Sequence, residues 1–262
     1  DFYVVTSAAS DHGLYIEQIK AKNVPIIVEK PLSKDIQEAQ RIIKLFHSKK
    51  LKPLVAYNFR FSMALAKVKA IIKEERIGEI LLFQAVVGQN LNKWRPERIL
   101  SETPSVSKTK GGGVLRELSH ELDYLYNLFG SPKLLSSIIA KKKFKAFDVE
   151  DLALLHLCYD SEDKNVLGSL NLDFIRHDPV RTCDIIGANG TIKWNLMEGS
   201  VKVVSKNFSL DCLYRFPDDI IESYNKMWIK FLNHEFEGFC TLEEALSHLT
   251  LIEDIESEEN LS

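Results

Sequence analysis

The chain has 262 residues, of which 45% are hydrophobic and 27% are charged, and its formal net charge is −3. This composition is typical of a globular protein of one large or two modest domains. Lysine and arginine are dispersed along the chain, and no apolar run reaches the ~18 residues of a membrane span, so we expect neither a nucleic-acid-binding surface nor a membrane anchor.

The first predicted elements form one strand–helix–strand unit. Residues 1–6 are predicted as a buried strand, Asp11–Lys22 as a helix, and Val24–Pro31 as a second strand, whose consecutive β-branched residues suit a parallel strand covered on both faces. A parallel strand needs neighbours on both sides, and the chain opens without an initiator methionine. We therefore expect the N-terminal half of this sheet to be missing, either from the gene or only from this sequence.

The second strand ends in Glu29, Lys30 and Pro31. In an open α/β sheet, the ligand crevice lies outside the carboxyl ends of the strands. Lys30 would be a proton donor there, with a pKa that falls if the amine is partly desolvated. The alternative is that Lys30 only begins a loop before Asp35 caps the next helix.

The pattern next changes from alternating strands and helices to consecutive strands. A helix is predicted from about Asp35 to Ser48, a strand over Lys52–Tyr57, and a helix that follows Asn58–Phe61 and is closed by Gly78. Strands are then predicted over Ile80–Gln89, Leu134–Lys143, Asp151–Tyr159, Asn165–Phe174, Arg181–Ile186, Thr191–Leu196 and Val201–Ser205. Because most of them follow one another without helices, they predict a large, mainly antiparallel sheet.

Two further helices are predicted at the end of the chain, over about Asp219–Glu237 and Thr241–Glu256. The second begins with a capping box from Thr241 to Glu244. The fold class expected from these elements is α/β (α+β): a partial Rossmann-type parallel sheet, followed by a domain with a large, mainly antiparallel open sheet flanked by helices. The domain boundary is expected between residues 1–57 and residues 58–262.

A long polar loop, Asn90–Lys110, interrupts the series of strands. Loops of this size inside a compact domain are usually functional or mobile. It contains Trp94 and Arg95, an aromatic ring beside a guanidinium, which could stack on a sugar ring and hydrogen-bond to it. The alternative is that Trp94 packs the loop onto the sheet.

The segment Gly111–Gly130 places a triple-glycine turn before a predicted helix. An apolar stripe on this helix faces a core, and it consists of Leu115, Leu118, Leu122, Leu125 and Phe129. Glu117 and His120 project together on another side, close enough to share a hydrogen bond or to touch the same ligand. That arrangement suits proton transfer, and the alternative is a solvated polar face formed by Glu117, His120 and Asp123.

The four cysteines, Cys158, Cys183, Cys212 and Cys240, are far apart and show no CxxC or His-rich spacing. We therefore expect neither a metal site nor a disulfide framework, and the simplest compartment is a reducing cytoplasm.

Five segments, in this order and spacing, resemble the Gfo/Idh/MocA family of NAD(P)-dependent oxidoreductases, which act mostly on sugars, sugar acids, inositols and nucleotide sugars. They are Ser7–His12, similar to the family's T-P-x-x-x-H segment; Glu29-Lys30-Pro31, its EKP motif; Tyr57–Phe61, similar to Y-N-x-R-F; Gly111–Gly113; and the following acid, histidine and aspartate ahead of Leu128-Phe129-Gly130. The resemblance runs through nearly the whole chain. Trp94-Arg95 and Leu118–Asp123 further resemble the branch found in bacterial surface-sugar biosynthesis.

The resemblance implies hydride transfer between NAD or NADP and a sugar, sugar-acid or nucleotide-sugar hydroxyl or ketone, with Lys30 and His120 at the reacting oxygen. The family usually carries an aspartate four residues before this histidine, whereas this chain has Arg116 there and Glu117 three residues before His120. The role of that aspartate is therefore expected to pass to Glu117, the third catalytic candidate.

The resemblance also implies the residues that hold cofactor and substrate. The cofactor candidates are Ser7, Ala8, His12, Glu29, Lys30, Pro31 and Asn58. The substrate candidates are Arg60, Trp94, Arg95, Asp123 and Tyr124. The family's G-x-G-x-x-G turn is not in this sequence, so this chain alone is not expected to bind the dinucleotide fully.

The expected partners are a small carbohydrate substrate and further copies of the chain. Leu134–Ala140 and Leu152–Leu157 are apolar on both faces of their strands, which predicts a homodimer or homotetramer through the antiparallel sheet. Two other functions stay open from the residues. One is a noncatalytic ligand-sensing or oligomerising module, and the other is a glycosidase that uses NAD transiently and gives net hydrolysis.

Overall fold

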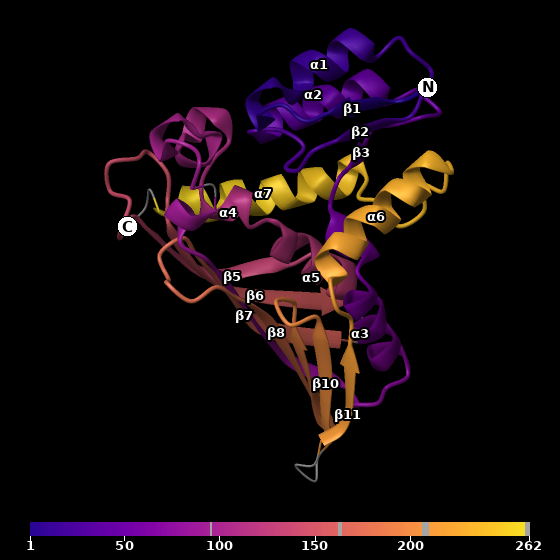
Figure 1. Ribbon diagram of the computed structural model, residues 1–262, viewed down its shortest axis with the longest axis vertical. Coiled ribbons are helices and arrows are strands. Elements are labelled where there is room, and N and C mark those ends of the chain that lie inside the picture. Colours follow the sequence, from indigo (N-terminus) through magenta and orange to yellow (C-terminus); the bar gives the residue numbers. More distant parts are fainter. Residues whose placement is uncertain (95, 162–163, 206–209, 260–262) are drawn as a thin grey trace.

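The computed structural model describes residues 1–94, 96–161, 164–205 and 210–259, and it contains two β-sheets with helices between and around them (Figure 1). The strands are β1 (Tyr3–Val5), β2 (Ile26–Val28), β3 (Leu54–Val55), β4 (Ile80–Gly88), β5 (Lys133–Ala140), β6 (Leu152–Ser161), β7 (Lys164–Asp173), β8 (Val180–Gly187), β9 (Gly190–Asn195), β10 (Ser200–Ser205) and β11 (Leu210–Arg215). The α-helices are α1 (His12–Ile19), α2 (Ile36–Phe46), α3 (Met63–Lys73), α4 (Val114–Glu117), α5 (His120–Phe129), α6 (Asp219–Leu232) and α7 (Leu242–Glu259). Short 3-10 helices are η1 (Ala9–Asp11), η2 (Asn58–Phe61), η3 (Leu91–Lys93), η4 (Leu100–Glu102), η5 (Pro104–Val106) and η6 (Lys108–Lys110).

The smaller sheet is parallel, with strand order β1-β2-β3. Ile26 and Val28 of β2 belong to the core formed with α1, α2 and the start of α7, whereas Ile27 packs with Met227 and Phe231 of α6 on the opposite face. The β-branched run is therefore covered on both faces, which explains its continuous hydrophobicity. Helix α7 also contacts β5 of the larger sheet, so it lies between the two sheets (Figure 1).

The larger sheet has eight strands in the order β11-β10-β9-β8-β4-β7-β6-β5. Every neighbouring pair is antiparallel except β4 and β7, which run parallel. The mixed α/β fold expected from the sequence, with a small parallel sheet and a large, mainly antiparallel one, is confirmed. Strand β11 was not expected, and it forms because pairing with β10 satisfies backbone groups along the edge of the sheet.

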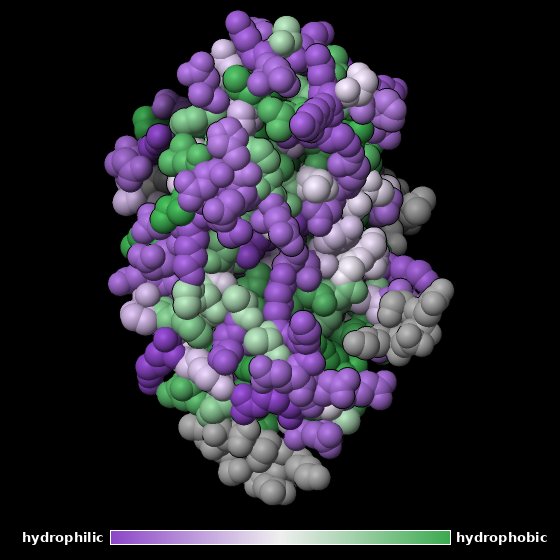
Figure 2. All heavy atoms as spheres, turned by 90° about the vertical axis from the view of Figure 1, so that its right-hand side faces the viewer, coloured by the Kyte–Doolittle hydropathy of each residue, from purple (hydrophilic) through white to green (hydrophobic). Residues whose placement is uncertain are grey.

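One face of the larger sheet is buried under α3, α4 and α5, with Phe83, Leu155 and Leu170 in its core. The other face is open and carries exposed apolar side chains on four neighbouring strands, namely Leu82, Ile138, Leu154 and Leu167. On the side of the molecule where α3 and α6 lie, hydrophobic and hydrophilic residues are intermixed (Figure 2). Among the described helices, none is long and apolar enough to cross a membrane.

The triple-glycine turn fixes where α4 begins. Gly113 has φ +108°, and a Cβ atom on it would lie 2.5 Å from the carboxylate of Glu150. A Cβ atom on Gly112 would lie 2.3 Å from the carbonyl oxygen of Pro104. Only glycine permits both the positive φ and these close approaches.

The prediction of a single helix after this turn is wrong. The helix ends at Glu117 and restarts at His120, because Leu118 adopts φ −98° and ψ 26°. The solvated-face alternative is wrong for His120 and Asp123, which are buried like the leucines of the expected stripe, whereas Glu117 is half-buried. This segment therefore lies in the interior, where each polar group needs a partner.

Candidate functional site

A cavity of about 250 Å³ lies where elements distant in sequence meet. The described residues that line it are Lys30, Trp94, Glu117, Leu118, His120 and Arg181. Lys30 follows β2, Trp94 comes from the long loop, Glu117 to His120 span the break between α4 and α5, and Arg181 is on β8. The structure thus brings together the three catalytic candidates and one substrate candidate from the sequence.

Lys30 reaches across from the small sheet to the helix break. Its Nζ donates a hydrogen bond to the backbone carbonyl of Glu117 at 2.6 Å and lies 3.8 Å from the Glu117 carboxylate. In an unbroken helix that carbonyl would accept from the amide of Glu121, which instead contacts Leu118. Burial lowers the pKa of Lys30, and the negative charges of Glu117 and Glu29 oppose this shift.

Glu117 does not hydrogen-bond to His120, contrary to the arrangement expected from helical spacing. Its carboxylate accepts a hydrogen bond from the Ser105 hydroxyl at 2.6 Å. The reason is the helix break, which turns Glu117 towards Lys30 and the long loop. The Lys30 amine, the Glu117 carboxylate and the Ser105 hydroxyl therefore form a row of polar groups that begins in the cavity.

His120 lies among aromatic rings. Its ring is 4.6 Å from that of Phe59 and 5.5 Å from that of Tyr57, measured between centroids. Nδ1 is buried and has no hydrogen-bond partner among the described residues. Burial, followed by the positive charges of Lys30 and Arg181, holds the pKa of His120 well below its ordinary value. The imidazole is therefore neutral at neutral pH, and its other nitrogen is left to the cavity that the ring lines.

Arg181 is a site residue that the sequence reasoning missed. Its guanidinium makes two hydrogen bonds to the buried carboxylate of Glu121, at 2.8 and 3.0 Å, and lies 4.7 Å from the centroid of the Phe59 ring. The only sequence signal for Arg181 was Glu121, because a carboxylate on a buried helix requires a cation nearby. That cation is 60 positions further along the chain, so local spacing did not reveal it.

The cofactor candidates at the small sheet divide into two groups. Ser7 and Ala8 follow β1 and Glu29 follows β2, so they lie at the carboxyl edge of two neighbouring parallel strands. His12 is buried, and its ring nitrogens lie 3.0 Å from the Ser7 carbonyl and 3.1 Å from the Pro31 carbonyl. Burial lowers the pKa of His12, although these carbonyls act in the opposite direction. His12 therefore links the segment after β1 to the segment after β2 through its two ring nitrogens, and its role is structural.

The Lys30–Pro31 peptide bond is cis, and it lies beside the cavity at this edge. Open α/β sheets bind ligands in a crevice outside the carboxyl ends of their strands, and the half-buried Lys30 lines the cavity at this place. Asn58 follows β3, the third parallel strand, but its side chain is turned into the interior. It is fully buried, and its amide donates to the Ser223 hydroxyl at 2.7 Å, which ties η2 to α6.

Three substrate candidates lie away from the cavity. Arg60 and Asp123 form a buried ion pair at 2.7 Å, because each is the charge partner that the other needs in the interior. Tyr124 is fully buried against Trp194. Trp94 does line the cavity, and its ring also packs edge-on against Phe174 at 5.4 Å. Arg95 lies outside the described residues.

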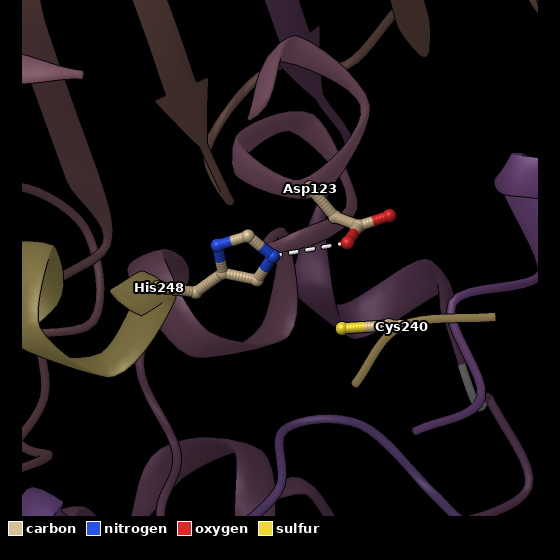
Figure 3. A group of neighbouring side chains, drawn as sticks. All are labelled: Asp123, Cys240 and His248. Atoms are coloured by element: carbon tan, nitrogen blue, oxygen red, sulfur yellow. Dashed lines mark hydrogen bonds and ion pairs between the residues drawn. The ribbon is translucent and has the colours of Figure 1, made fainter. Parts of the chain in front are cut away.

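Asp123 also belongs to a group that resembles a metal site, together with Cys240 and His248 (Figure 3). His248 Nε2 lies 2.9 Å from Asp123 Oδ1, and both Asp123 oxygens accept hydrogen bonds from Arg60. Burial and the charge of Asp123 raise the pKa of Cys240 well above its ordinary value. A metal ion at this place would need Cys240 as a thiolate and free electron pairs on the Asp123 carboxylate. The thiol is instead held protonated and the carboxylate already accepts hydrogen bonds, so this group does not fit a metal. It ties the start of α7 to α5.

Two family models match the chain. Residues 1–57 match the model described as "Oxidoreductase family, NAD-binding Rossmann fold", and residues 65–193 match the "GFO/IDH/MocA C-terminal domain". Among curated proteins, "Uncharacterized oxidoreductase C115.03" of Schizosaccharomyces pombe is 23% identical over 163 residues, which are 62% of this chain and 43% of that protein. D-apiose dehydrogenase of Rhizobium rhizogenes is 28% identical over 79 residues, which are 30% of this chain and 23% of that protein.

The chain thus spans less than half of the length of these curated relatives. A solved structure of levoglucosan dehydrogenase, in complex with NADH and levoglucosan, superimposes on it with a TM-score of 0.81 at 18% identity. That superposition covers 98% of this chain and 77% of the other. At this identity the likeness concerns the fold.

Proposed function

The chain belongs to the GFO/IDH/MocA family of NAD-binding oxidoreductases, and from this premise we propose that it transfers a hydride between NAD or NADP and a hydroxyl or ketone carbon of a sugar or polyol. The observation that supports the proposal is the convergence of Lys30 and His120 on one cavity beside the carboxyl edge of the parallel sheet. D-Apiose and levoglucosan, named for two of the similar proteins, belong to this class of substrate.

Lys30 is the proton carrier in this proposal. Bound nicotinamide supplies the two-electron acceptor that takes the hydride from the carbinol carbon. As the C–H bond breaks, the hydroxyl proton passes to the neutral amine of Lys30, which its lowered pKa makes more accessible at neutral pH. The carboxylate of Glu117, 3.8 Å from Lys30 Nζ, balances the charge of the protonated amine.

The spacing of Glu117 and His120 suggested proton transfer, but in this proposal His120 does not remove the hydroxyl proton. Burial, together with the positive charge of Arg181, makes it a weak base. In the tautomer that carries its proton on Nε2, the neutral imidazole avoids an unpaired N–H at the buried Nδ1 and presents a donor to the cavity, where it would stabilise the reacting oxygen as negative charge develops. Reversal of the reaction returns the proton from Lys30 to that oxygen.

The proposal is tested by reduced-nicotinamide absorbance with the purified protein and a panel of sugars and polyols. NAD or NADP is supplied at high concentration, because this chain alone is not expected to bind the dinucleotide fully. Lys30→Met is expected to lower turnover at least ~100-fold, because no other described residue that lines the cavity carries an amine that can take up the proton. Lys22→Met, on the exposed surface, is the matched control and should retain activity. Full turnover in Lys30→Met would contradict the assignment.

The open face of the larger sheet supports the partner expected from the sequence, a second copy of the chain. Exposed Leu82, Ile138, Leu154 and Leu167 lie on strands that neighbour one another. Apolar side chains on one continuous sheet face are characteristic of interfaces between subunits. We propose that the protein forms a homodimer or homotetramer through this face.

A further inference from the structure

A second, smaller cavity adjoins the one that Lys30 and His120 line. It measures about 160 Å³, and its described lining residues are Leu91, Asn92, Trp94, Arg98, Leu100, Thr103 and Ser105, all from the long loop. Trp94 lines both cavities. Ser105 connects them again, since its hydroxyl donates to the carboxylate of Glu117 in the wall of the first cavity. The two cavities therefore share the wall formed by Trp94, and a ligand that reached past this ring would enter the second.

The second cavity has apolar walls and a polar rim. Leu91, Leu100 and the indole of Trp94 supply the apolar part. Thr103 is buried, and its hydroxyl already donates to the Leu100 carbonyl at 2.7 Å, which leaves its oxygen free to accept. Within the described part of the chain, the side chains of Asn92 and Arg98 have no hydrogen-bond partner and can donate to a ligand.

The walls of this cavity are held in place. The Trp94 ring packs edge-on against Phe174, which is fully buried in the core of the larger sheet. Leu91 is also buried, and its amide donates to the Phe174 carbonyl at 3.1 Å. The loop is thus fixed on the sheet at the point where the cavity forms, so its shape exists before a ligand binds.

Size indicates what each cavity can hold. Pockets for drug-sized ligands have volumes of roughly 300–1,000 Å³. Cavities of about 250 and 160 Å³ each fall below that range, so each suits a unit of ring size. Aromatic and aliphatic walls with hydrogen-bonding groups at the rim match a sugar ring, which has apolar C–H faces and a hydroxyl edge.

We propose that the second cavity is a subsite for a second sugar ring, so that the preferred substrate is a disaccharide rather than a single sugar ring. This inference rests on the proposed function, which places the reacting ring in the first cavity. Arg98 is the only cation in the described lining of the second cavity, and it is exposed, so the described residues offer a single solvated charge to a nucleotide diphosphate.

The test is binding, measured by calorimetry with the purified protein. The probes are cellobiose, maltose and gentiobiose, compared with methyl α- and β-glucoside and with p-nitrophenyl β-glucoside. At least one disaccharide is expected to bind ~10-fold or more tightly than the methyl glucosides, which is the usual effect of one additional group in a fitted pocket. Leu100→Trp, which fills the second cavity, is expected to abolish this preference.

Ile99→Trp is the matched control, because Ile99 is 65% exposed and adds the same bulk outside the cavity. Arg98→Ala, at an exposed position, is a second variant that removes one donor, and it should weaken disaccharide binding severalfold. Equal binding of disaccharides and methyl glucosides would overturn the subsite, as would a preference that survives Leu100→Trp. Tighter binding of the p-nitrophenyl glucoside than of every disaccharide would assign the cavity to an aromatic group and overturn the sugar assignment. Absence of binding by every saccharide would contradict the proposed function itself.

Discussion

The Nζ of Lys30 donates a hydrogen bond to the backbone carbonyl of Glu117, 87 positions further along the chain. This contact joins the carboxyl edge of the parallel sheet to the break between α4 and α5. It also separates two influences of Glu117 on Lys30. The backbone carbonyl holds the amine in place, whereas the carboxylate raises its pKa.

Glu117→Gln is therefore expected to lower turnover less than Lys30→Met does, since the contact with the carbonyl remains. Removal of the negative charge should lower the pKa of Lys30 further. In the oxidation direction, where the neutral amine takes the proton, the rise of kcat with pH should move to lower pH. A complete pH–rate profile of both proteins measures the shift, and a profile that moves to higher pH would contradict this reading of Lys30.

His120 predicts a dependence of stability on pH. Its pKa in the folded protein lies well below the ordinary value of 6.5, so between these two values the unfolded chain binds a proton that the folded protein does not. The free energy of unfolding should therefore fall as pH decreases through 6.5, by at most about 1.4 kcal/mol per pH unit for this histidine.

Denaturant unfolding of the unmodified protein and of His120→Gln, at several pH values, measures this contribution. The decrease at low pH should be shallower in the variant. His12, whose pKa is also lowered, contributes equally to both proteins and cancels in the comparison. Above pH 6.5 the difference between the two proteins should be constant, and a difference that does not change with pH anywhere would contradict a neutral His120.

Replacement of the adjacent residues Glu150 and Asp151 by the corresponding amides should change the stability of the protein in opposite directions. Burial raises the pKa of Glu150 to about 6 from 4.5. The folded protein therefore holds the proton more tightly than the unfolded chain, and ionisation above pH 6 costs about 2 kcal/mol of stability. Glu150→Gln keeps an oxygen that can accept from the Leu115 amide and should stabilise the protein at pH 7 but not below pH 4.5.

Asp151 instead accepts hydrogen bonds from the backbone amides of Lys142, Lys143 and Phe144. Its Oδ2 takes two of them, so an Asn amide in that position would meet two donors. Asp151→Asn should therefore destabilise the protein by about 1–3 kcal/mol. Melting temperatures of both variants at pH 4 and pH 7 distinguish the two residues, and the same sign for both at pH 7 would refute the assignment.

The proposed interface on the larger sheet predicts the oligomeric state. Light scattering at micromolar concentration should give the mass of a dimer or tetramer. Ile138→Lys, at an exposed position in the middle of β5, should shift the protein to a monomer because a buried unpaired ammonium is unfavourable. Ile221→Lys, equally exposed on α6, is the control and should leave the mass unchanged. A monomeric unmodified protein would rule out the interface.

The sequence alone determined the features that depend on neighbouring residues. The β-branched run of β2, the Glu29-Lys30-Pro31 end and the glycine turn each have a local pattern with a local cause. They sufficed to predict the fold class, and they identified Lys30, Glu117, His120 and Trp94, which meet in one cavity.

Only the tertiary structure decided how those residues are connected. Helical spacing paired Glu117 with His120, but Lys30 takes the Glu117 carbonyl and the helix breaks between them. Arg60 and Asp123, two expected substrate residues, neutralise each other in the interior, because a buried charge binds the nearest opposite charge however distant it is in sequence. Arg181 enters the site for the same reason, held by Glu121. Local patterns record which groups a segment carries, whereas the partner of a buried charge is set by the packing of the whole chain.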